Sequence, residues 1–261
     1  MSEQTDFEPP TGVAQDLGRG IRRIVAPNPS PMTFRGTNTY LVGDHGLAVI
    51  DPGPDDGAHL EAILGAVGPG QRITHILVTH AHVDHSPLAG PLAEATGAPV
   101  LAFGTARDGR SAAMTRLAAS GLRDGGEGLD LAFRPNVTLA DGDSISGDGW
   151  EMTAHWTPGH LGNHMCFEMG GAIFTGDLVM GWASSLVSPP DGDLTDFMAS
   201  CARLAGLRAE VFHAGHGAPI DRPAERLEWL IAHRRGRERD ILSALSRQAA
   251  TARDLAQAIY T

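Results

Sequence analysis

The sequence predicts an α/β fold. Short apolar segments of strand length alternate with segments in which apolar residues recur at helical spacing, and glycine- or proline-rich turns separate them. With 261 residues, 42% of them hydrophobic and 20% charged, the chain has an ordinary globular composition and can bury a large core. The elements fall into two successive halves without a detectable repeat. This order predicts the class and leaves the architecture open.

In the N-terminal half, residues 1–20 are expected to form a flexible lead-in. The strand candidates that follow are 21–25, 38–42, 47–50, 73–78 and 100–103. One helix is expected at 56–67, where a Gly-Pro-Gly turn follows it. Another is expected at 87–96, with Pro87 in its first turn.

The C-terminal half begins with a glycine- and arginine-rich stretch, 104–128, in which a short helix is expected at 112–119. Further strand candidates are 136–139, 150–156, 164–169, 172–174 and 210–212. Helices are expected at 194–207 and, from a long amphipathic pattern, at 223–247.

The charge pattern excludes some chemistry. A net charge of −11 argues against a general nucleic-acid-binding protein, because such proteins bind by neutralising phosphates. All 20 basic residues are arginine, and the lack of lysine excludes Schiff-base and lysine-nucleophile chemistry.

The two cysteines, Cys166 and Cys201, stand far apart and outside any CxxC pattern, so neither a disulfide framework nor a zinc finger is indicated. The N-terminal residues are acidic and polar, without the features of a signal peptide, and no apolar run approaches the length of a membrane span. We therefore expect a cytoplasmic protein without membrane contact.

The most informative segment is the run from Thr79 to Ser86, which follows an apolar strand candidate. His80, His82, Asp84 and His85 lie within six residues of one another in this run. Imidazole and carboxylate are the ligands of a borderline metal such as zinc. The segment predicts a metal site.

Further candidate ligands follow other strand candidates. They are His160, His164, Asp177 and His216. A glycine directly precedes three of them, and glycine permits close backbone approach and unusual dihedral angles. Their shared placement after strands favours a ligand role over ordinary turn positions.

The motifs His80-x-His82-x-Asp84-His85, Gly159-His160, Gly176-Asp177 and Gly215-His216, in this order, resemble those of the metallo-β-lactamase-fold superfamily of binuclear metallohydrolases. They span most of residues 20–220. The resemblance implies a four-layer αββα sandwich with the metals in a cleft at one edge of the paired sheets. It also implies a catalytic domain at 1–221 and a C-terminal helical extension at 222–261, a shortened winged-helix-like segment.

The same resemblance implies two divalent metal ions, with zinc favoured and iron or manganese as alternatives. One ion would be bound by His80, His82 and His160. The second would take Asp84, His85 and His216, and Asp177 would bridge the two. Two such ions, two carboxylates and a bridging hydroxide leave a charge of about +1, which suits an anionic substrate or a developing oxyanion.

The resemblance also bears on the roles of four residues. Asp84 is counted with the catalytic residues, as is His164, which is interpreted as holding a metal ligand in orientation. Asp51 resembles a family aspartate that supports the ligand loop, with an ordinary turn cap as the alternative. His213 is interpreted as structural.

Two residues reduce the number of superfamily branches to which the chain could belong. True β-lactamases lack the bridging aspartate, so Asp177 argues against them, and His82 argues against flavodiiron proteins, which have glutamate there. Glyoxalase II-like thioesterases, persulfide dioxygenases and the lactamase-like (β-lactamase-like protein 2 type) branch, which includes single-strand ribonucleases, remain. Segments 29–42, 160–165 and 232–238 resemble the last of these most.

We therefore expect a metal-dependent hydrolase that uses a metal-bridging hydroxide on an ester, thioester or phosphodiester. An iron-dependent dioxygenase on the same fold and a single-strand ribonuclease are the alternatives. Residues 222–247 carry seven arginines and four acidic residues, a net charge of +3, which favours a solvated helix over a nucleic-acid face. A small-molecule or anionic substrate is expected, with cleft candidates Trp182, Ser184, Ser185 and Leu186. The oligomeric state is left open.

Overall fold

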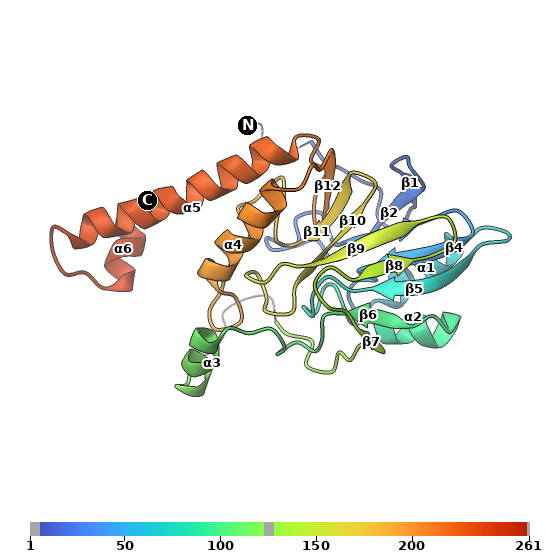
Figure 1. Ribbon diagram of the computed structural model, residues 1–261, viewed down its shortest axis with the longest axis horizontal. Helices are drawn as coiled ribbons and strands as arrows, with labels where there is room; N and C mark the ends of the chain where they lie inside the picture. The colour runs from blue at the N-terminus through green and yellow to red at the C-terminus, as the bar shows by residue number, and fades with distance from the viewer. Residues whose placement is uncertain (1–5, 123–127, 260–261) are drawn as a thin grey trace.

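The computed structural model describes residues 6–122 and 128–259. Two β-sheets face each other, and helices cover the outer face of each, which gives four layers in the order αββα (Figure 1). The predicted fold class is confirmed.

The first sheet contains seven strands that neighbour one another in chain order. They are β1 (Gln15–Asp16), β2 (Ile21–Val25), β3 (Asn38–Val42), β4 (Gly46–Ile50), β5 (Arg72–Leu77), β6 (Val100–Ala102) and β7 (Val137–Thr138). Strands β1 to β4 pair antiparallel, whereas β4 to β7 pair parallel. The change of direction follows from the connections, because parallel neighbours need a crossover and helices supply it.

The second sheet has the order β12-β11-β10-β9-β8. Its strands are β8 (Ser144–Ser146), β9 (Glu151–Trp156), β10 (Met165–Met169), β11 (Ala172–Gly176) and β12 (Val211–Ala214). All neighbours are antiparallel except β11 and β12, which a helical crossover makes parallel. Each sheet therefore has a parallel pair whose carboxyl ends lie side by side.

The helices are α1 (Gly57–Gly65), α2 (Ala89–Thr96), α3 (Ala112–Ala119), α4 (Leu194–Ala205), α5 (Pro223–Leu245) and α6 (Ala252–Ile259). Side chains of Asp56, Ser111 and Asp193 cap the first turns of α1, α3 and α4 by accepting backbone N–H groups. Pro223 begins α5, where its missing N–H is not needed.

Three apolar clusters hold the layers together. One lies between the sheets and includes Tyr40, Phe167 and Phe174. A second packs α1 and α2 on the first sheet, and the third packs α4 and the start of α5 on the second sheet. A fully buried side chain of this size contributes about 1.5–3 kcal/mol by leaving water, so burial on both faces of each sheet fixes the strand register.

Several predicted elements are confirmed residue for residue, namely the strands 21–25 and 38–42 and the helix 112–119. Most of the others differ by one to three residues at their ends. Pro87 precedes α2 and is not part of its first turn, because the preceding turn closes through the Ala89 N–H, which donates to the Ser86 carbonyl.

The expectation of a flexible lead-in is wrong for the described residues before β2. Strand β1 pairs with β2, and the Gly12 N–H donates to the Val25 carbonyl at 2.9 Å. Residues 1–5 of that prediction lie outside the described ranges, as do 123–127 of the glycine- and arginine-rich stretch. Strand β8 was not predicted, because it has three residues and only Ile145 is buried. Helix α6 lies in the predicted C-terminal helical extension, but it was not predicted as a separate helix because it has only eight residues.

The C-terminal helices have two different environments. Leu227 and Leu230 near the start of α5 are buried against the second sheet, whereas Leu242 near its end is 60% exposed. In Figure 1, α5 runs outward past the sheets and α6 folds back beside its far end. The boundary between a catalytic part and an extension at 221/222 stays a prediction.

Two further expectations can be compared with the structure. Cys166 and Cys201 are unpaired, buried thiols, and burial raises the pKa of each to about 12. Across residues 6–122 and 128–259, none of the helices combines the length and apolarity that crossing a membrane requires.

One buried histidine of the core predicts a pH dependence of stability. His213 in β12 stacks on Phe174, with ring centroids 5.2 Å apart, and burial followed by repulsion from Arg23 and Arg19 lowers its pKa to about 4. The unfolded chain, with an ordinary histidine pKa near 6.5, therefore binds one more proton than the native state between these values. The contribution of neutral His213 to the free energy of unfolding is therefore complete above pH 6.5 and is lost as the pH falls toward 4.

We expect His213→Leu to remove about one proton from the pH dependence of the unfolding free energy between pH 6.5 and 4, measured by urea unfolding of metal-free protein. Phe174→Leu is the matched control, since it weakens the same contact without removing a titrating group. An unchanged slope in His213→Leu would show that His213 is protonated in the native protein.

Candidate metal centre

The histidine run forms a tight loop at the carboxyl end of β5. His80, His82, Asp84 and His85 are all buried, at 0–6% exposure. The loop closes on itself, because the His85 and Ser86 N–H groups both donate to the His82 carbonyl at 3.1 Å. All four side chains are therefore held at the end of the first sheet.

Asp51, at the end of the neighbouring parallel strand β4, fixes this loop. Its carboxylate accepts the Thr79 N–H and the Thr79 hydroxyl, each at 2.7 Å, and lies 2.9 Å from His85 Nδ1. The Asp51 backbone has φ = +50°, a left-handed conformation that an aspartate tolerates better than most residues. The structure thus places Asp51 in the loop-supporting position and not in a simple turn cap.

The second sheet supplies the remaining candidates from its own strand ends. His160 follows β9, Asp177 follows β11 directly, and His216 follows β12. Gly215 lies so close to this group that a methyl group there would overlap Asp177 Oδ1 and approach His85 Cε1 to 2.7 Å. Glycine is therefore a steric requirement at this position.

Seven side chains form two buried groups in which the potential ligand atoms lie within 4.8 Å of one another. The first group is His80, His82 and His160, and the second is Asp84, His85, Asp177 and His216. The Asp177 carboxylate lies between them, with Oδ2 3.3 Å from His216 Nε2 and 3.8 Å from His160 Nε2. The two groups contain the residues predicted for the two ions, with Asp177 in the second group. Their role as ligands, and the bridging role of Asp177, stay predictions.

Most of these atoms have no hydrogen-bond partner among the described residues. The atoms concerned are His80 Nε2, His85 Nε2, His216 Nε2 and both carboxylate oxygens of Asp84 and Asp177. Each buried polar atom without a partner costs about 1–3 kcal/mol. Because these atoms all point at one region, the site calls for an additional, positively charged partner. A nitrogen- and oxygen-only donor set fits zinc, iron or manganese.

In His80, His160 and His216 the Nδ1 atom is hydrogen-bonded away from the group, so that Nε2 faces inward. His160 Nδ1 lies 2.7 Å from the Leu186 carbonyl, and His216 Nδ1 lies 3.2 Å from the Gly36 carbonyl. His80 Nδ1 lies 2.9 Å from the Thr79 hydroxyl, which in turn donates to Asp51. A carbonyl partner requires a proton on Nδ1 and leaves Nε2 as the electron-pair donor that a metal needs.

The histidine pKa values are shifted in opposite directions in the two groups. Burial lowers the pKa of His80 well below its usual value, and the surrounding histidines lower it further. Burial also opposes charge on His216, but Asp177 and Asp84 outweigh it and raise the pKa of His216 to about 10. Despite burial, His216 and His85 lower the pKa of the Asp177 carboxyl well below its usual range. In the metal-free protein, protonated His85 and His216 therefore neutralise the Asp84 and Asp177 carboxylates where the second ion is expected.

His164 lies beside the groups without belonging to either. Its Nδ1 is 3.0 Å from the Thr157 hydroxyl, and its ring packs against that of His80 with centroids 5.1 Å apart. Among the described residues it makes no hydrogen bond to the seven candidates. It acts on His80 through ring packing, and it adds to the repulsion that, after burial, lowers the pKa of His80.

The sequence did not predict the groups that form hydrogen bonds to the outer ring nitrogens of the candidate ligands. Thr79, the Gly36 carbonyl and the Leu186 carbonyl all bond to candidate ligands. Leu186 was predicted as a cleft residue, but it contacts His160 through its backbone. Backbone carbonyls leave no signal in the side-chain pattern, so only the fold identifies them.

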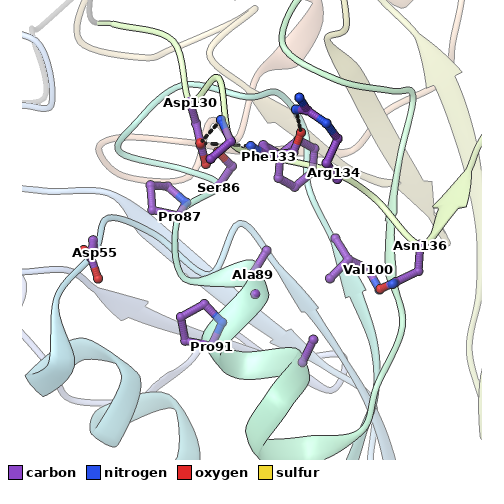
Figure 2. A pocket seen from close by; sticks show the side chains of 13 residues that line it. Asp55, Ser86, Pro87, Ala89, Pro91, Val100, Asp130, Phe133, Arg134 and Asn136 are labelled. Carbon is purple, nitrogen blue, oxygen red and sulfur yellow. Dashed lines mark hydrogen bonds between the residues drawn. The ribbon is translucent and has the colours of Figure 1, made fainter.

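A separate cavity of about 540 Å³ lies on the helical side of the first sheet, behind the ligand loop (Figure 2). None of the seven candidates lines it. Its polar lining is internally bonded: the Ser86 hydroxyl donates to Asp130 at 2.8 Å, and Asn136 Oδ1 accepts the Val100 N–H at 2.8 Å. The chemistry therefore concentrates at the two buried groups and not in this cavity.

Comparison with known proteins agrees with the geometry. The family model described as the metallo-beta-lactamase superfamily matches residues 32–216. The chain is 33% identical over 236 residues to the lactamase-like protein adaB of Aspergillus niger, an alignment that covers 88% of the chain and 65% of adaB. The chain thus spans just under two thirds of that relative.

Two other proteins show similar relationships. The beta-lactamase-like protein 2 homolog of Caenorhabditis elegans is 28% identical over 266 residues, which cover 100% of the chain and 81% of that protein. The solved structure of TTHA1623 in a di-iron-bound form has a TM-score of 0.58 and 28% identity, covering 78% of the chain and 96% of TTHA1623.

We expect Asp51→Asn to weaken zinc binding roughly 10–100-fold, the usual effect of losing a group that orients a ligand, because an amide cannot accept from all three donors. Asparagine tolerates the left-handed backbone, so the fold is retained. The measurement is competition with a chromogenic chelator. Asp56→Asn, which keeps the cap of α1, is the matched control, and equal affinity in both variants would contradict the role of Asp51.

We expect Gly215→Ala to fold but to lose zinc from the second group, because the added methyl displaces Asp177 and His85. Zinc stoichiometry by elemental measurement, with circular dichroism for the fold, tests this. Gly90→Ala in α2, where nothing lies within 4 Å of the added carbon, should bind zinc as the wild type does. Wild-type stoichiometry in Gly215→Ala would refute the steric argument.

Proposed function

The chain belongs to the metallo-beta-lactamase superfamily, and on that premise we propose that it is a binuclear metal-dependent hydrolase acting on an ester, thioester or phosphodiester. The observation that carries the proposal is the pair of buried ligand groups that share Asp177. A general metal-dependent hydrolase is what the superfamily and the donor set together support.

The proposed ligands are divided as the two groups are. His80, His82 and His160 would hold one ion, and Asp84, His85 and His216 the other, with Asp177 between them. When bound, two such ions would lower the pKa of a water molecule toward neutrality and polarise the bond to be cleaved. No serine, cysteine or lysine nucleophile is then required.

The chain's own residues have three tasks in this proposal. Asp51 and the two carbonyls would keep the rings of His85, His160 and His216 in the tautomer that donates an electron pair from the inward nitrogen. Asp84, whose oxygens have no hydrogen-bond partner among the described residues, would accept the proton of the attacking water. His164 would keep the His80 ring in place by packing.

Zinc is the proposed metal, because a set of histidine and aspartate ligands suits it and needs no redox chemistry. The same ligands bind iron, and TTHA1623 has been solved with two iron ions. The rival proposal is therefore an iron-dependent dioxygenase.

The substrate is proposed to be small or anionic, since two divalent ions leave the site with net positive charge. A ribonuclease activity is the second rival. It has weaker support, because the chain carries a net charge of −11. The aspartate at position 177 disfavours β-lactam hydrolysis as the main reaction.

A panel of four substrates tests the reaction class: a lactoylglutathione thioester, an aryl phosphodiester, single-stranded RNA and a β-lactam. We expect zinc-loaded protein to turn over the thioester or the phosphodiester, to lose activity with a chelator and to regain it with Zn²⁺. Turnover of only the β-lactam would sink the proposal, as would iron as the sole bound metal together with oxygen consumption.

Within this panel, Asp84→Asn should lower kcat by about 100-fold or more, the usual range for losing a general base or a metal ligand. Asp148→Asn is the matched control, since Asp148 is exposed and far from the ligand loop in the sequence. Wild-type kcat in Asp84→Asn with both metals bound would exclude the assigned role.

A further inference from the structure

We propose that Arg226 and Arg234 of α5 are positioning residues for the metal ligand His160, which they hold through the loop of residues 178–187. The inference rests on the proposed function, because it concerns the same metal centre. It assigns a role to the C-terminal helix α5, which from the sequence was expected only to be a solvated helix.

Arg226 is a buried arginine that binds the loop at two points. Its Nε donates to the Met180 carbonyl at 2.7 Å, and its Nη2 donates to the Ala183 carbonyl at 2.5 Å. The residue is only 6% exposed, and its guanidinium lies 4.3 Å from the ring centroid of Trp229. Burial lowers the pKa of Arg226, but its usual value is so high that the charge is kept.

Arg234, two turns further along the same helix, binds the next part of the loop. Its Nη2 donates to the carbonyls of Ser184, at 2.8 Å, and Ser185. Its guanidinium lies 5.3 Å from the ring centroid of Phe197 in α4. Two arginines of one helix thus bind four carbonyls within six residues of loop.

The next residue of the loop reaches the metal centre. The Leu186 carbonyl follows the Arg234 contacts directly and accepts the proton of His160 Nδ1 at 2.7 Å. His160 Nε2 then faces His82 Nδ1 at 3.0 Å and Asp177 Oδ2 at 3.8 Å. The path from α5 to the three-histidine group therefore consists of two hydrogen-bonded steps.

The loop needs this support because its own backbone conformation is unfavourable. Ser185, a non-glycine residue, has φ = +58° while it is buried, and its hydroxyl donates to the Leu178 carbonyl at 3.0 Å. Such a conformation costs on the order of 1 kcal/mol or more and persists only where the surroundings impose it. The arginine contacts on both sides of it supply that restraint.

The two arginines differ in a way that a lysine substitution can test. Arg226 uses two different nitrogens for two carbonyls, which a single ammonium group cannot reproduce. Arg234 uses one nitrogen for both of its carbonyls, so an ammonium with three protons can replace it. Arg234→Lys should therefore retain the positioning, whereas Arg226→Lys should not.

The experiment follows zinc release and the His160 ring in the full-length protein. Zinc-loaded wild type, Arg226→Met, Arg234→Met and the two lysine variants are mixed with excess chelator, and the two phases of release are timed. We expect one of the two phases of zinc release to become roughly tenfold faster in both methionine variants and in Arg226→Lys. This is the low end of the loss in metal affinity that follows when a metal ligand loses the group that orients it. Arg234→Lys should release zinc at the wild-type rate.

The matched control is Arg222→Met, which removes the arginine directly before the same helix, whose side chain is 74% exposed and paired only with Glu225 in the described contacts. Nitrogen-15 NMR of the histidine rings provides a second readout that needs no activity. The proton on His160 Nδ1 should be observed in the wild type and in Arg234→Lys, and should exchange rapidly in the methionine variants.

The outcomes separate this inference from the proposed function. Wild-type release rates and a wild-type His160 signal in folded methionine variants would overturn the role of α5 and leave the hydrolase proposal intact. A wild-type protein that binds no pair of zinc ions would instead defeat the proposed function. In that case the His160 ring signal of metal-free protein still decides whether the arginines position it.

Discussion

Seven ionisable side chains are buried together where the ends of two sheets meet, and the rest of the structure is arranged around the cost of burying them. The inward atoms of five of them, His80, Asp84, His85, Asp177 and His216, have no hydrogen-bond partners among the described residues. Two carboxylates and two raised-pKa histidines lie within contact of one another. A folded chain retains such a cluster only where its geometry is imposed from outside. That geometry is imposed by Asp51, by the carbonyls of Gly36 and Leu186, and by the close approach of Gly215 to Asp177.

The sheet topology explains why the cluster forms at this place. Each sheet contains a parallel pair, β4 with β5 and β11 with β12, and the chain leaves each pair at its carboxyl end into a ligand-bearing turn. Asp51 and the histidine loop come from one pair, and Asp177 and His216 from the other. Packing the sheets face to face through the Phe167 and Phe174 layer brings the two ends together.

The sequence alone predicted the parts of this arrangement that depend on side-chain identity. His80, Asp84 and Asp177 are conspicuous because histidine and aspartate after apolar strands have few other uses, and the strands themselves show regular apolar patterns. The groups that orient the ligands could not be predicted in the same way, since Gly36 and Leu186 act through carbonyls. The edge strand β1 was missed because a two-residue, largely exposed element carries little apolar signal.

A ligand held by a carbonyl has one more consequence, for how such a site can change over generations. The side chain of Leu186 is 38% exposed and takes no part in holding His160, because the backbone does so. Position 186 can therefore accept other side chains while the bond that orients the histidine stays the same. The surface beside the candidate metal centre and the centre itself can diverge independently at this residue.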